Sequence, residues 1–289
     1  MGFDYRRGVA IVTGASSGIG RAIALDLAAR GTNVVLVARR RESLEDVLGA
    51  CRRTAPASWA VPLDVADRNG VEDMIAQTLE RFGAVDVLVN NAAVPLRRHV
   101  LRLTPEEVQH AMAVNFMGAV CATLAVLPSM VERGTGHVVN VGSLGGRMGT
   151  PRDAGYSATK FALAGWSEAL AVDLHGSGVG IHLITVGPVR TPFGRKLQER
   201  ASYRGPLGRP ESVAAAVRSC LERGGFERVV PWWFAPIPWL RLAFPDRFIG
   251  WVARFDRKRD PNAVPWRRHV RTRSSIEIGL RGGTRSSRP

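Results

Sequence analysis

A tyrosine and a lysine, Tyr156 and Lys160, stand four residues apart in the stretch YSATK. On a helix, side chains at positions i and i+4 lie one above the other on the same face. If that face lined a cleft, the lysine would lower the pKa of the phenol and prepare it for proton transfer. The alternative is structural, with the tyrosine ring packed and the lysine reaching solvent. The pair alone leaves both interpretations open.

The composition is that of a globular protein, with 45% apolar and 22% charged residues in 289. This length allows one large domain, and we find no internal repeat. Three scattered cysteines, Cys51, Cys121 and Cys220, predict neither a disulfide framework nor a metal site, and favour a reducing, cytoplasmic compartment. The N-terminal sequence is a poor signal peptide, and no run of 18 uncharged apolar residues predicts a transmembrane helix.

Apolar runs alternate with amphipathic segments along most of the chain. This alternation predicts a doubly wound parallel sheet of about seven strands, with helices on both faces. Ligands of such folds bind at the carboxyl ends of the strands. The predicted strands include 8–13, 33–38, 58–65, 85–92, 136–143 and 180–187. The predicted helices are 18–31, 41–53, 70–83, 104–130 and the segment with Tyr156 and Lys160.

The stretch TGASSGIG, residues 13–20, joins the first predicted strand to the first helix. Its glycines at 14, 18 and 20 would let the backbone approach a pyrophosphate at the helix N-terminus, where free amides and the helix dipole favour an anion. The spacing is GxxxGxG rather than the commoner GxGxxG. A plain tight turn is the alternative. The loop residues expected to contact a dinucleotide are Gly14, Ser16, Ser17, Gly18, Ile19 and Gly20.

Three arginines, 39–41, follow the second predicted strand. An acidic residue at this place would hold the ribose 2′-hydroxyl of NAD. Arginine instead pairs with a 2′-phosphate, so the sequence favours NADP(H), with Arg39 as the expected contact. The alternative is that these arginines are only the exposed start of a helix. Further along, beside Val65, Asp64 would accept a hydrogen bond from the adenine amino group or cap the following helix.

Taken together, these motifs resemble the classical short-chain dehydrogenase/reductase family over roughly residues 6–230. The resemblance implies a Rossmann-type sheet and hydride transfer between a nicotinamide cofactor and an alcohol/ketone pair. Because several independent motifs occur in the right order, it favours the catalytic interpretation of the YSATK pair. Besides the glycine loop, the residues that carry it are Asn90, Asn91, Ala92, Asn115, Ser143 (13 residues before Tyr156), Tyr156 and Lys160.

The resemblance also implies roles for four polar residues. Tyr156 would be the general acid in reduction and the base in oxidation, with its usual pKa of ~10 lowered by Lys160 and the positively charged nicotinamide. Lys160 would also bind the nicotinamide ribose. Ser143 would donate to the substrate oxygen, and Asn115 would hold a water that links Lys160 to solvent. Beyond Tyr156 and Lys160, further cofactor contacts would be Val65, Asn91, Ala92, Gly187, Val189 and Thr191.

Two positions depart from the family pattern. Ala93 stands where glycine is usual, and Val186 replaces the proline of PGxVxT. Alanine tolerates a positive φ poorly, so we expect a small shift of that turn beside the cofactor. Neither change removes a catalytic group. Substrate choice is expected from the segments 94–103, 144–155 and 190–210, which do not identify a substrate.

An aromatic segment, expected over 231–256, follows the catalytic domain of 1–230. It holds four of the seven tryptophans, and one helix through Pro245 would give it an apolar face. Aromatic residues beside arginine suit a membrane surface or a lid over an apolar substrate. Packing on the domain or on a second subunit is the alternative. The residues of the expected apolar face are Leu240, Phe244, Phe248 and Trp251.

The formal net charge of +15 is concentrated near the C-terminus. Eleven basic and three acidic residues lie between Arg254 and Pro289. We expect residues 257–289 to form a disordered, solvated tail. Such tails can also bind nucleic acid or anionic lipid, although nucleic acid is not the partner we expect.

The sequence therefore predicts a cytoplasmic oxidoreductase that uses NADP(H) on an alcohol/ketone pair with an apolar or lipid-like substrate. A homo-oligomer, dimer or tetramer, is expected, and a peripheral membrane contact through 231–256 stays open. One alternative is an NAD(H)-dependent dehydrogenase of the same fold. Another is a catalytically silent nucleotide-binding scaffold at a membrane surface. The intact set of four polar residues argues against a scaffold, which has no need of all four.

Overall fold

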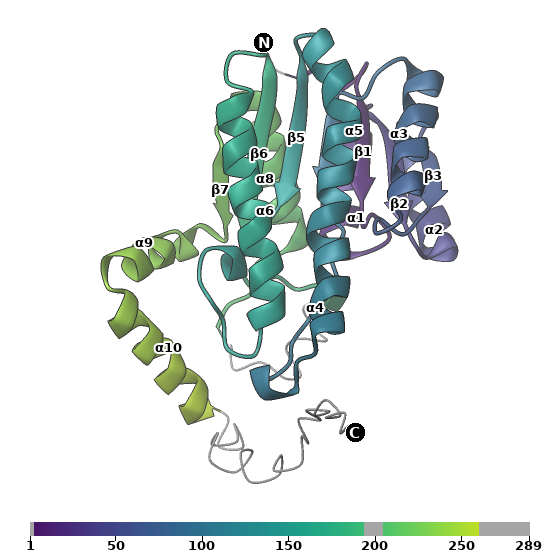
Figure 1. The fold of residues 1–289 in the computed structure, drawn as a ribbon. Helices are drawn as coiled ribbons and strands as arrows, with labels where there is room; N and C mark the ends of the chain where they lie inside the picture. The colour runs from purple at the N-terminus through teal and green to yellow at the C-terminus, as the bar shows by residue number, and fades with distance from the viewer. Residues whose placement is uncertain (1–2, 194–204, 260–289) are drawn as a thin grey trace, which may run out of the picture.

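The computed structural model describes residues 3–193 and 205–259, with side chains as far as Arg254. Seven parallel strands form one sheet in the order β3-β2-β1-β4-β5-β6-β7, and helices cover both of its faces (Figure 1). The predicted doubly wound, Rossmann-type sheet is therefore confirmed. The strands are β1 (Val9–Thr13), β2 (Asn33–Ala38), β3 (Trp59–Pro62), β4 (Val87–Asn90), β5 (Gly136–Val141), β6 (Val179–Val186) and β7 (Glu227–Val230).

The sheet separates two apolar core layers, and β1 contributes to both. Successive side chains of a strand point to opposite faces, so Ala10 and Val12 pack with α1, α2 and α8, whereas Val9 and Ile11 pack with α3, α5 and α6. Burial on both faces explains why the central strands are continuous apolar runs. These helices are α1 (Gly18–Ala28), α2 (Arg41–Cys51), α3 (Arg68–Phe82), α5 (Gly118–Glu132), α6 (Ala154–Asp173) and α8 (Pro210–Arg223).

The helix predicted over 104–130 is interrupted by a π-helical turn. Thr104 and Glu107 form the predicted capping box in front of α4 (Pro105–Met112). The turn η2 (Ala113–Met117) then leads into α5. By length and composition, the run Pro105–Glu132 could cross a membrane, which our sequence criterion missed. Its most apolar window is 44% buried inside the structure, and the residues of α5 on its buried side pack on the sheet.

Two histidines stack on each other in β5 and β6. Nδ1 of His137 lies 3.1 Å from Nε2 of His182, whose Nδ1 lies 2.8 Å from the carbonyl oxygen of Gly225. The pKa of His137 is lowered to about 4, mainly by burial and also by His182, while Asp86 acts in the opposite direction. Burial also lowers the pKa of His182. Both rings are therefore neutral at neutral pH, with His182 donating to the carbonyl and accepting from His137.

This pair predicts a loss of stability in mild acid. Between the unfolded pKa of ~6.5 and the folded value near 4, the unfolded chain binds more protons, so stability decreases as the pH falls. We expect His137 to reduce the free energy of unfolding by about 2 kcal/mol between about pH 7 and pH 5. Urea unfolding at both pH values should show a weaker pH dependence for His137→Gln than for wild type. The exposed His175→Gln is the control, and equal pH dependence in all three proteins would refute this assignment.

After β7, the chain forms a helical arm instead of one helix. It comprises η4 (Trp232–Phe234), α9 (Pro236–Ala243) and α10 (Pro245–Arg259). The prediction of a single helix through Pro245 is wrong, because the chain leaves helical geometry at Phe244, with φ −139° and ψ 62°. Pro245 begins α10, where its missing N–H costs no helical hydrogen bond. α10 extends past the expected boundary at 256, and the rest of the predicted tail, 260–289, lies outside the described residues.

Candidate active site

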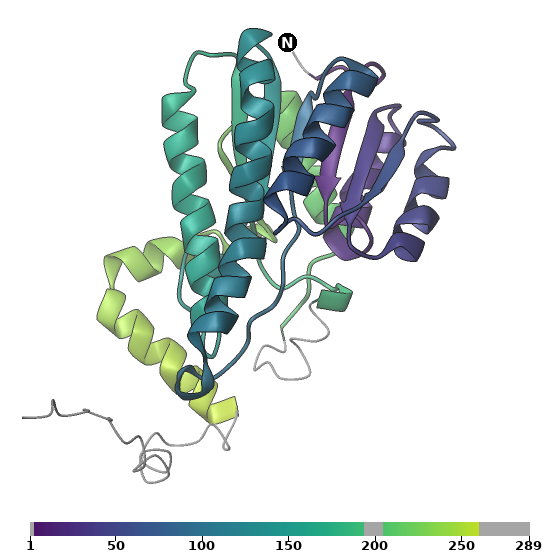
Figure 2. The same cartoon turned by 45° about the vertical axis from the view of Figure 1, so that its right-hand side comes forward.

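The predicted site residues gather at the carboxyl edge of the sheet. The loops that follow β1, β4, β5 and β6 all leave from this edge, and the helical arm begins at the same end of the molecule (Figures 1 and 2). Parallel strands end at a common edge, so segments far apart in sequence meet there.

The glycine loop has the geometry of an anion-binding turn. Gly14 and Gly18 have φ values of 67° and 57°, which favour glycine. A Cβ on Gly20 would lie 2.4 Å from the carbonyl oxygen of Gly14 and 2.5 Å from Nδ2 of Asn91. Ser17 is the N-cap of α1, but its side chain does not cap the helix. The loop therefore presents backbone at a helix N-terminus, which fits the phosphates of a dinucleotide.

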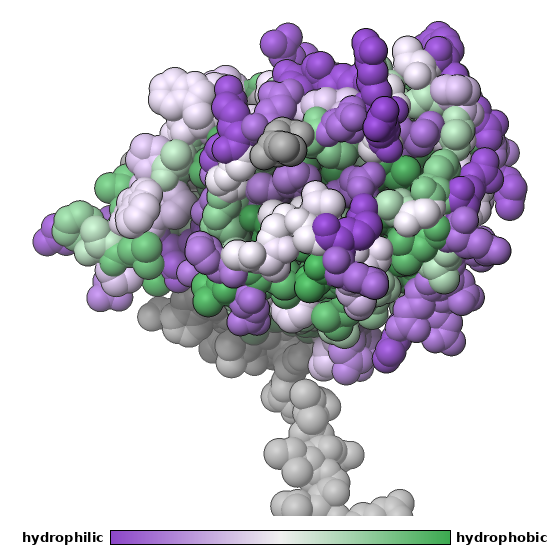
Figure 3. Space-filling model, turned by 90° about the horizontal axis from the view of Figure 1, so that it is seen from above, coloured by the Kyte–Doolittle hydropathy of each residue, from purple (hydrophilic) through white to green (hydrophobic). Residues whose placement is uncertain are grey.

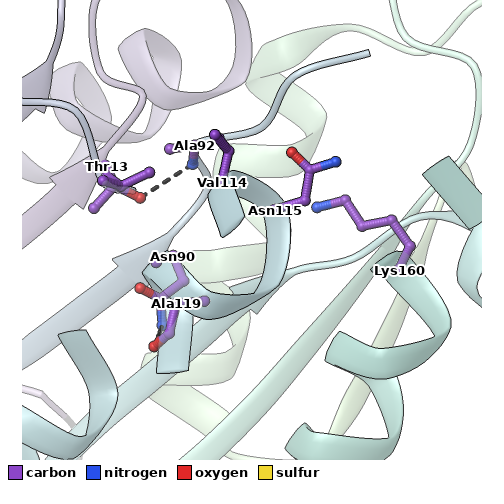
Figure 4. A pocket seen from close by; sticks show the side chains of 9 residues that line it. Thr13, Asn90, Ala92, Val114, Asn115, Ala119 and Lys160 are labelled. Atoms are coloured by element: carbon purple, nitrogen blue, oxygen red, sulfur yellow. Dashed lines mark hydrogen bonds between the residues drawn. The ribbon is translucent and has the colours of Figure 1, made fainter. Parts of the chain in front are cut away.

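Thr13 joins the glycine loop to the end of β4. Its hydroxyl accepts hydrogen bonds from the amides of Asn91 (2.9 Å) and Ala92 (3.0 Å), the second of which is drawn in Figure 4. Asn91 returns a side-chain bond to the carbonyl oxygen of Thr13 at 2.9 Å. The turn is unstrained at Ala93, because Arg152 is the only non-glycine residue with a positive φ in the described ranges. The small shift of this turn relative to the family pattern stays a prediction.

The side-chain amide of Asn90, in contrast, is buried inside the protein. Its side chain donates to Oδ1 of Asn140 on β5 at 2.9 Å and to the hydroxyl of Thr123 on α5 at 3.0 Å. A buried amide with such partners fixes neighbouring elements. The first asparagine of the family motif is thus a structural residue in this chain.

Of the three arginines after β2, Arg40 lies closest to the glycine loop. One guanidinium nitrogen lies 3.2 Å from the hydroxyl oxygens of both Ser16 and Ser17. Arg39, the residue favoured from sequence, instead lies 3.5 Å from a carboxylate oxygen of Asp64. Arg40 therefore faces the loop, whereas the predicted contact of Arg39 with a 2′-phosphate stays a prediction.

Asp64 does not cap the next helix, so that alternative is wrong. Asp67 is the N-cap of α3 and accepts from the amide of Gly70 at 3.2 Å. Asp64 accepts from the amide of Ala66 at 3.1 Å, which holds the turn after β3. Its carboxylate stays at the carboxyl edge, where it pairs with Arg39.

Asn115 lies in the π-helical turn and connects three segments. Its Oδ1 accepts from the amide of Val94 at 2.7 Å, and its Nδ2 donates to the carbonyl of Val94 and to the hydroxyl of Thr159 on α6. Lys160 extends from α6 toward Asn115 (Figure 4). A small pocket between them, with Val65 in its lining, has room for about one water molecule.

Ser143, Tyr156 and Lys160 form the centre of the site. The hydroxyl of Ser143 accepts from the amide of Gly145 at 3.0 Å, and it hydrogen-bonds the phenol of Tyr156. The ammonium of Lys160, only 3% exposed, donates to the carbonyl of Val141 at 2.9 Å. Three groups that can exchange protons therefore meet between the end of β5 and the first turns of α6.

Burial is the largest influence on the pKa values of Tyr156 and Lys160. The pKa of Tyr156 is raised to about 12, mainly by burial and also by Asp153, against the lowering effect of the Ser143 hydrogen bond. Burial lowers the pKa of Lys160 to about 8. The net effect of the protein's own groups is to raise the pKa of the phenol. They keep Tyr156 protonated at neutral pH. The lowering expected from Lys160 together with the positively charged nicotinamide stays a prediction for the cofactor complex.

A buried ion pair joins two of the predicted substrate segments. A guanidinium nitrogen of Arg97 lies 3.0 Å from a carboxylate oxygen of Asp153, and each side chain is less than 15% exposed. Asp153 directly precedes α6 and also accepts from the hydroxyl of Thr150 at 3.1 Å. The pair holds the segment 94–103 against the start of the helix that carries Tyr156.

The segment that follows β6 forms a further part of the site. The amide of Gly187 donates to the carbonyl of Val230 at 2.7 Å, and Val189 pairs with Gly208 in an isolated bridge. Thr191 is buried, and a Cβ on Gly18 would lie 3.3 Å from it. Thr191 therefore lies beside the glycine loop, and the contacts of Gly187, Val189 and Thr191 with the cofactor stay predictions. Within the third substrate segment, residues 194–204 lie outside the described residues.

Sequence reasoning missed four residues that the structure brings to this edge. Thr13 directly precedes the first glycine, and Asp153 occupies the position before a predicted helix, so both carried a signal. Arg40 is one of three consecutive arginines, which the sequence does not distinguish, and nothing in the sequence pointed to Arg97.

The part of the chain with described coordinates has no group of three or more metal-ligating residues, and its three cysteines are free thiols.

Comparisons with known proteins agree with this geometry. The family model described as short chain dehydrogenase matches residues 8–202. The chain therefore belongs to the short-chain dehydrogenase family. Members are oxidoreductases that bind a nicotinamide cofactor, and this chain is an enzyme of that class.

Three similar proteins show the range of the family. A Drosophila melanogaster "dehydrogenase/reductase SDR family protein 7-like" is 33% identical over 63% of this chain, but only 57% of its own length is matched. A 3-oxoacyl-[acyl-carrier-protein] reductase of Synechocystis sp. is 35% identical over 73% of this chain and 87% of the relative. The crystal structure of a variant of actinorhodin polyketide ketoreductase with NADPH has a TM-score of 0.73 and 31% identity, covering 80% of this chain and 97% of that one.

Proposed function

We propose that the protein is an NADP(H)-dependent reductase of apolar ketones, with Tyr156 as its general acid. The observation that carries this proposal is the hydrogen-bonded pair of hydroxyls, Ser143 and Tyr156, next to the buried Lys160 at the carboxyl edge. An oxyanion-type donor, a protonated acid and a cation stand together where a parallel sheet binds its ligand. Such a set has no evident use in a protein that only binds a nucleotide.

The residues around the glycine loop fit a dinucleotide. Backbone at Gly14 and Gly18 and the N-terminus of α1 would hold the pyrophosphate. Arg40, beside Ser16 and Ser17, would bind the 2′-phosphate of NADP(H) as a bidentate cation. When bound, the cofactor supplies the hydride for reduction of a carbonyl carbon and accepts it in the reverse reaction.

The protein's own residues supply the proton for the reduction. With a pKa near 12, Tyr156 carries its proton at neutral pH and can give it to the oxygen of a ketone as that oxygen gains negative charge. In the substrate complex, the hydroxyl hydrogen of Ser143 would turn from the phenol of Tyr156 to donate to the same substrate oxygen, while Ser143 still accepts from Gly145. The carbonyl thereby becomes an alcohol, and the phenol is left without its proton.

Lys160 and the pocket beside Asn115 would restore that proton. An ammonium group with a pKa near 8 exchanges protons readily near neutral pH. The pocket between Lys160 and Asn115 is large enough for a water molecule that could pass protons on. The positive charge of Lys160 would also stabilise the phenolate while it exists. We assign the relay role to these two residues.

Two apolar side chains near Tyr156 and the name of one relative support an apolar substrate. The ring of Phe193 lies 6.0 Å from that of Tyr156, and Leu96 lies beside Gly155 at the start of α6. The name of the Synechocystis relative specifies a 3-oxoacyl substrate. A 3-oxoacyl thioester is therefore the first substrate to test.

NADPH consumption should be measured over thioesters of increasing chain length. Cofactor binding without turnover of any carbonyl would favour the scaffold alternative.

Arg40 is expected to carry much of the preference for NADPH over NADH. Loss of a charge-assisted pair to the 2′-phosphate would raise the Kd for NADPH about 10–100-fold in Arg40→Ala, with little effect on NADH. Arg39→Ala should have a smaller effect, because Arg39 pairs with Asp64. Arg41→Ala, in the first turn of α2, is the matched control. Fluorescence titration of both cofactors measures the four proteins, and equal Kd values for NADPH and NADH in wild type would move the NAD(H) alternative ahead.

A further inference from the structure

Among the described residues, eight of the fifteen large exposed apolar side chains lie in one C-terminal segment. We call residues 231–254, which comprise η4, α9 and the described side chains of α10, the C-terminal arm. In the space-filling view, pale and green side chains project at the left, where Figure 1 places α9 (Figure 3). Exposed patches of this kind mark interaction sites. The large exposed apolar residues of the arm are Trp232, Trp233, Trp239, Leu240, Leu242, Phe244, Ile249 and Trp251.

The first residues of the arm pack against the segment that follows β6 in the active site. Phe234 is buried, and a Cβ on Gly187 would lie 3.0 Å from its ring. Farther along, the guanidinium of Arg241 lies 5.4 Å from the ring centre of Phe161, which directly follows Lys160 on α6. A surface that binds the arm would therefore also orient the carboxyl edge of the sheet.

The net positive charge of the arm favours an anionic partner. Arg241, Arg247 and Arg254 stand among its apolar residues, against a single acidic residue, Asp246. The chain after them, 257–289, adds ten basic and two acidic residues. In a two-fold symmetric contact, the same patch would meet itself, so two copies of this arm would bring like charges together. An anionic surface has no such conflict.

Tryptophan and arginine together identify the kind of surface. Tryptophan rings favour the boundary between headgroups and acyl chains of a bilayer. Arginine binds phosphate with a planar, bidentate geometry. Short helices with exposed apolar residues and basic side chains lie in that interface, and their affinity rises with the content of anionic lipid. The arm combines these features on two short helices.

We propose that the C-terminal arm docks the enzyme on an anionic phospholipid surface, with the carboxyl edge of the sheet held near the bilayer. The tryptophans of η4 and α9 enter the headgroup region, and the arginines bind lipid phosphates. This proposal concerns the location of the enzyme and does not depend on which carbonyl compound is its substrate.

The test is flotation of the full chain with phosphatidylcholine vesicles, with and without phosphatidylglycerol. Wild type should float with the anionic vesicles, and lipids brominated near the headgroup should quench its tryptophan fluorescence. Trp239→Glu and Leu242→Glu should each lower the bound fraction about tenfold or more. Val172→Glu is the matched control, because Val172 is 72% exposed on α6, outside the arm, and Trp239 is 73% exposed. All variants should keep wild-type NADPH binding, which shows that they fold.

Three results would overturn the proposal. A wild-type chain that stays with the soluble fraction excludes lipid docking. Binding that survives unchanged in both arm variants would assign it to the basic sequence 257–289. A change of mass in sedimentation equilibrium between wild type and Trp239→Glu, without vesicle binding, would show that the arm joins two copies of the chain.

Discussion

Replacing Tyr156 with phenylalanine should lower the kcat of carbonyl reduction about 10²–10⁴-fold, the usual contribution of a general acid. The phenylalanine ring keeps the packing of tyrosine but has no proton to give. The Kd for NADPH should stay within about twofold of wild type, because the glycine loop and the arginines do not change. Steady-state kinetics with a 3-oxoacyl thioester and fluorescence titration of NADPH measure the two quantities.

Tyr5→Phe serves as the matched control for this experiment. Tyr5 hydrogen-bonds Glu222 at 3.2 Å, away from the residues of the active site. Its loss should leave kcat unchanged. If Tyr156→Phe reduced the substrate as fast as wild type, Tyr156 would not be the acid. The proton would then have to come from another group, and the centre proposed above would be wrong.

Replacing Lys160 with methionine should lower kcat/KM about 10²–10³-fold, the range seen when one positioned donor is removed from an active site. Methionine fills a similar volume without the charge. In contrast to Tyr156→Phe, this change should also raise the KM for NADPH, since Lys160 is expected to bind the nicotinamide ribose. Removing a buried charge is not expected to unfold the protein, and thermal unfolding checks this.

The pH profile separates a catalytic role of Lys160 from a structural one. The ammonium group has a pKa near 8, so the charged form that supports reduction is lost as the pH rises through that value. Wild-type kcat/KM should therefore fall above about pH 8, and Lys160→Met should show no such limb. The phenol, with a pKa near 12, would titrate well above this range. An identical alkaline limb in the variant would show that another group titrates there.

Much of the fold could be read from the sequence because its signals are local. The apolar runs of β1 and β2 are buried on both faces, and only a parallel sheet with two helical layers satisfies several such runs. Once the sheet is parallel, the strands end at one edge, and the loops after them must meet. This is why Gly14, Asn91 and Ser143 could be placed together without knowing any contact.

The remaining features depend on side-chain direction and on competition between similar residues. Arg39 and Arg40 have the same chemistry, and only the backbone course after β2 decides which one meets Ser16 and Ser17. Asp64 and Asp67 are both suitable caps, but the helix begins one residue after Asp67. No local pattern could decide either choice.

The pKa of Tyr156 shows the same limit for electrostatics. The i, i+4 spacing placed a cation one turn away, which suggested a lowered pKa. Burial of the phenol has the opposite sign and is the largest contribution in the folded chain. Sequence shows the spacing of charges, whereas the extent of burial is known only from the packed structure.

The central claim, reduction of a carbonyl with NADPH, is tested most directly by following the transferred hydrogen. Wild-type protein would be mixed with a 3-oxoacyl thioester and NADPH deuterated at the transferable position of the nicotinamide, and the product analysed by mass spectrometry. We predict a 3-hydroxyacyl thioester with one deuterium on the carbinol carbon, and almost none of this product with Tyr156→Phe. An alcohol without deuterium, or NADPH binding without any product over the whole chain-length series, would contradict the claim.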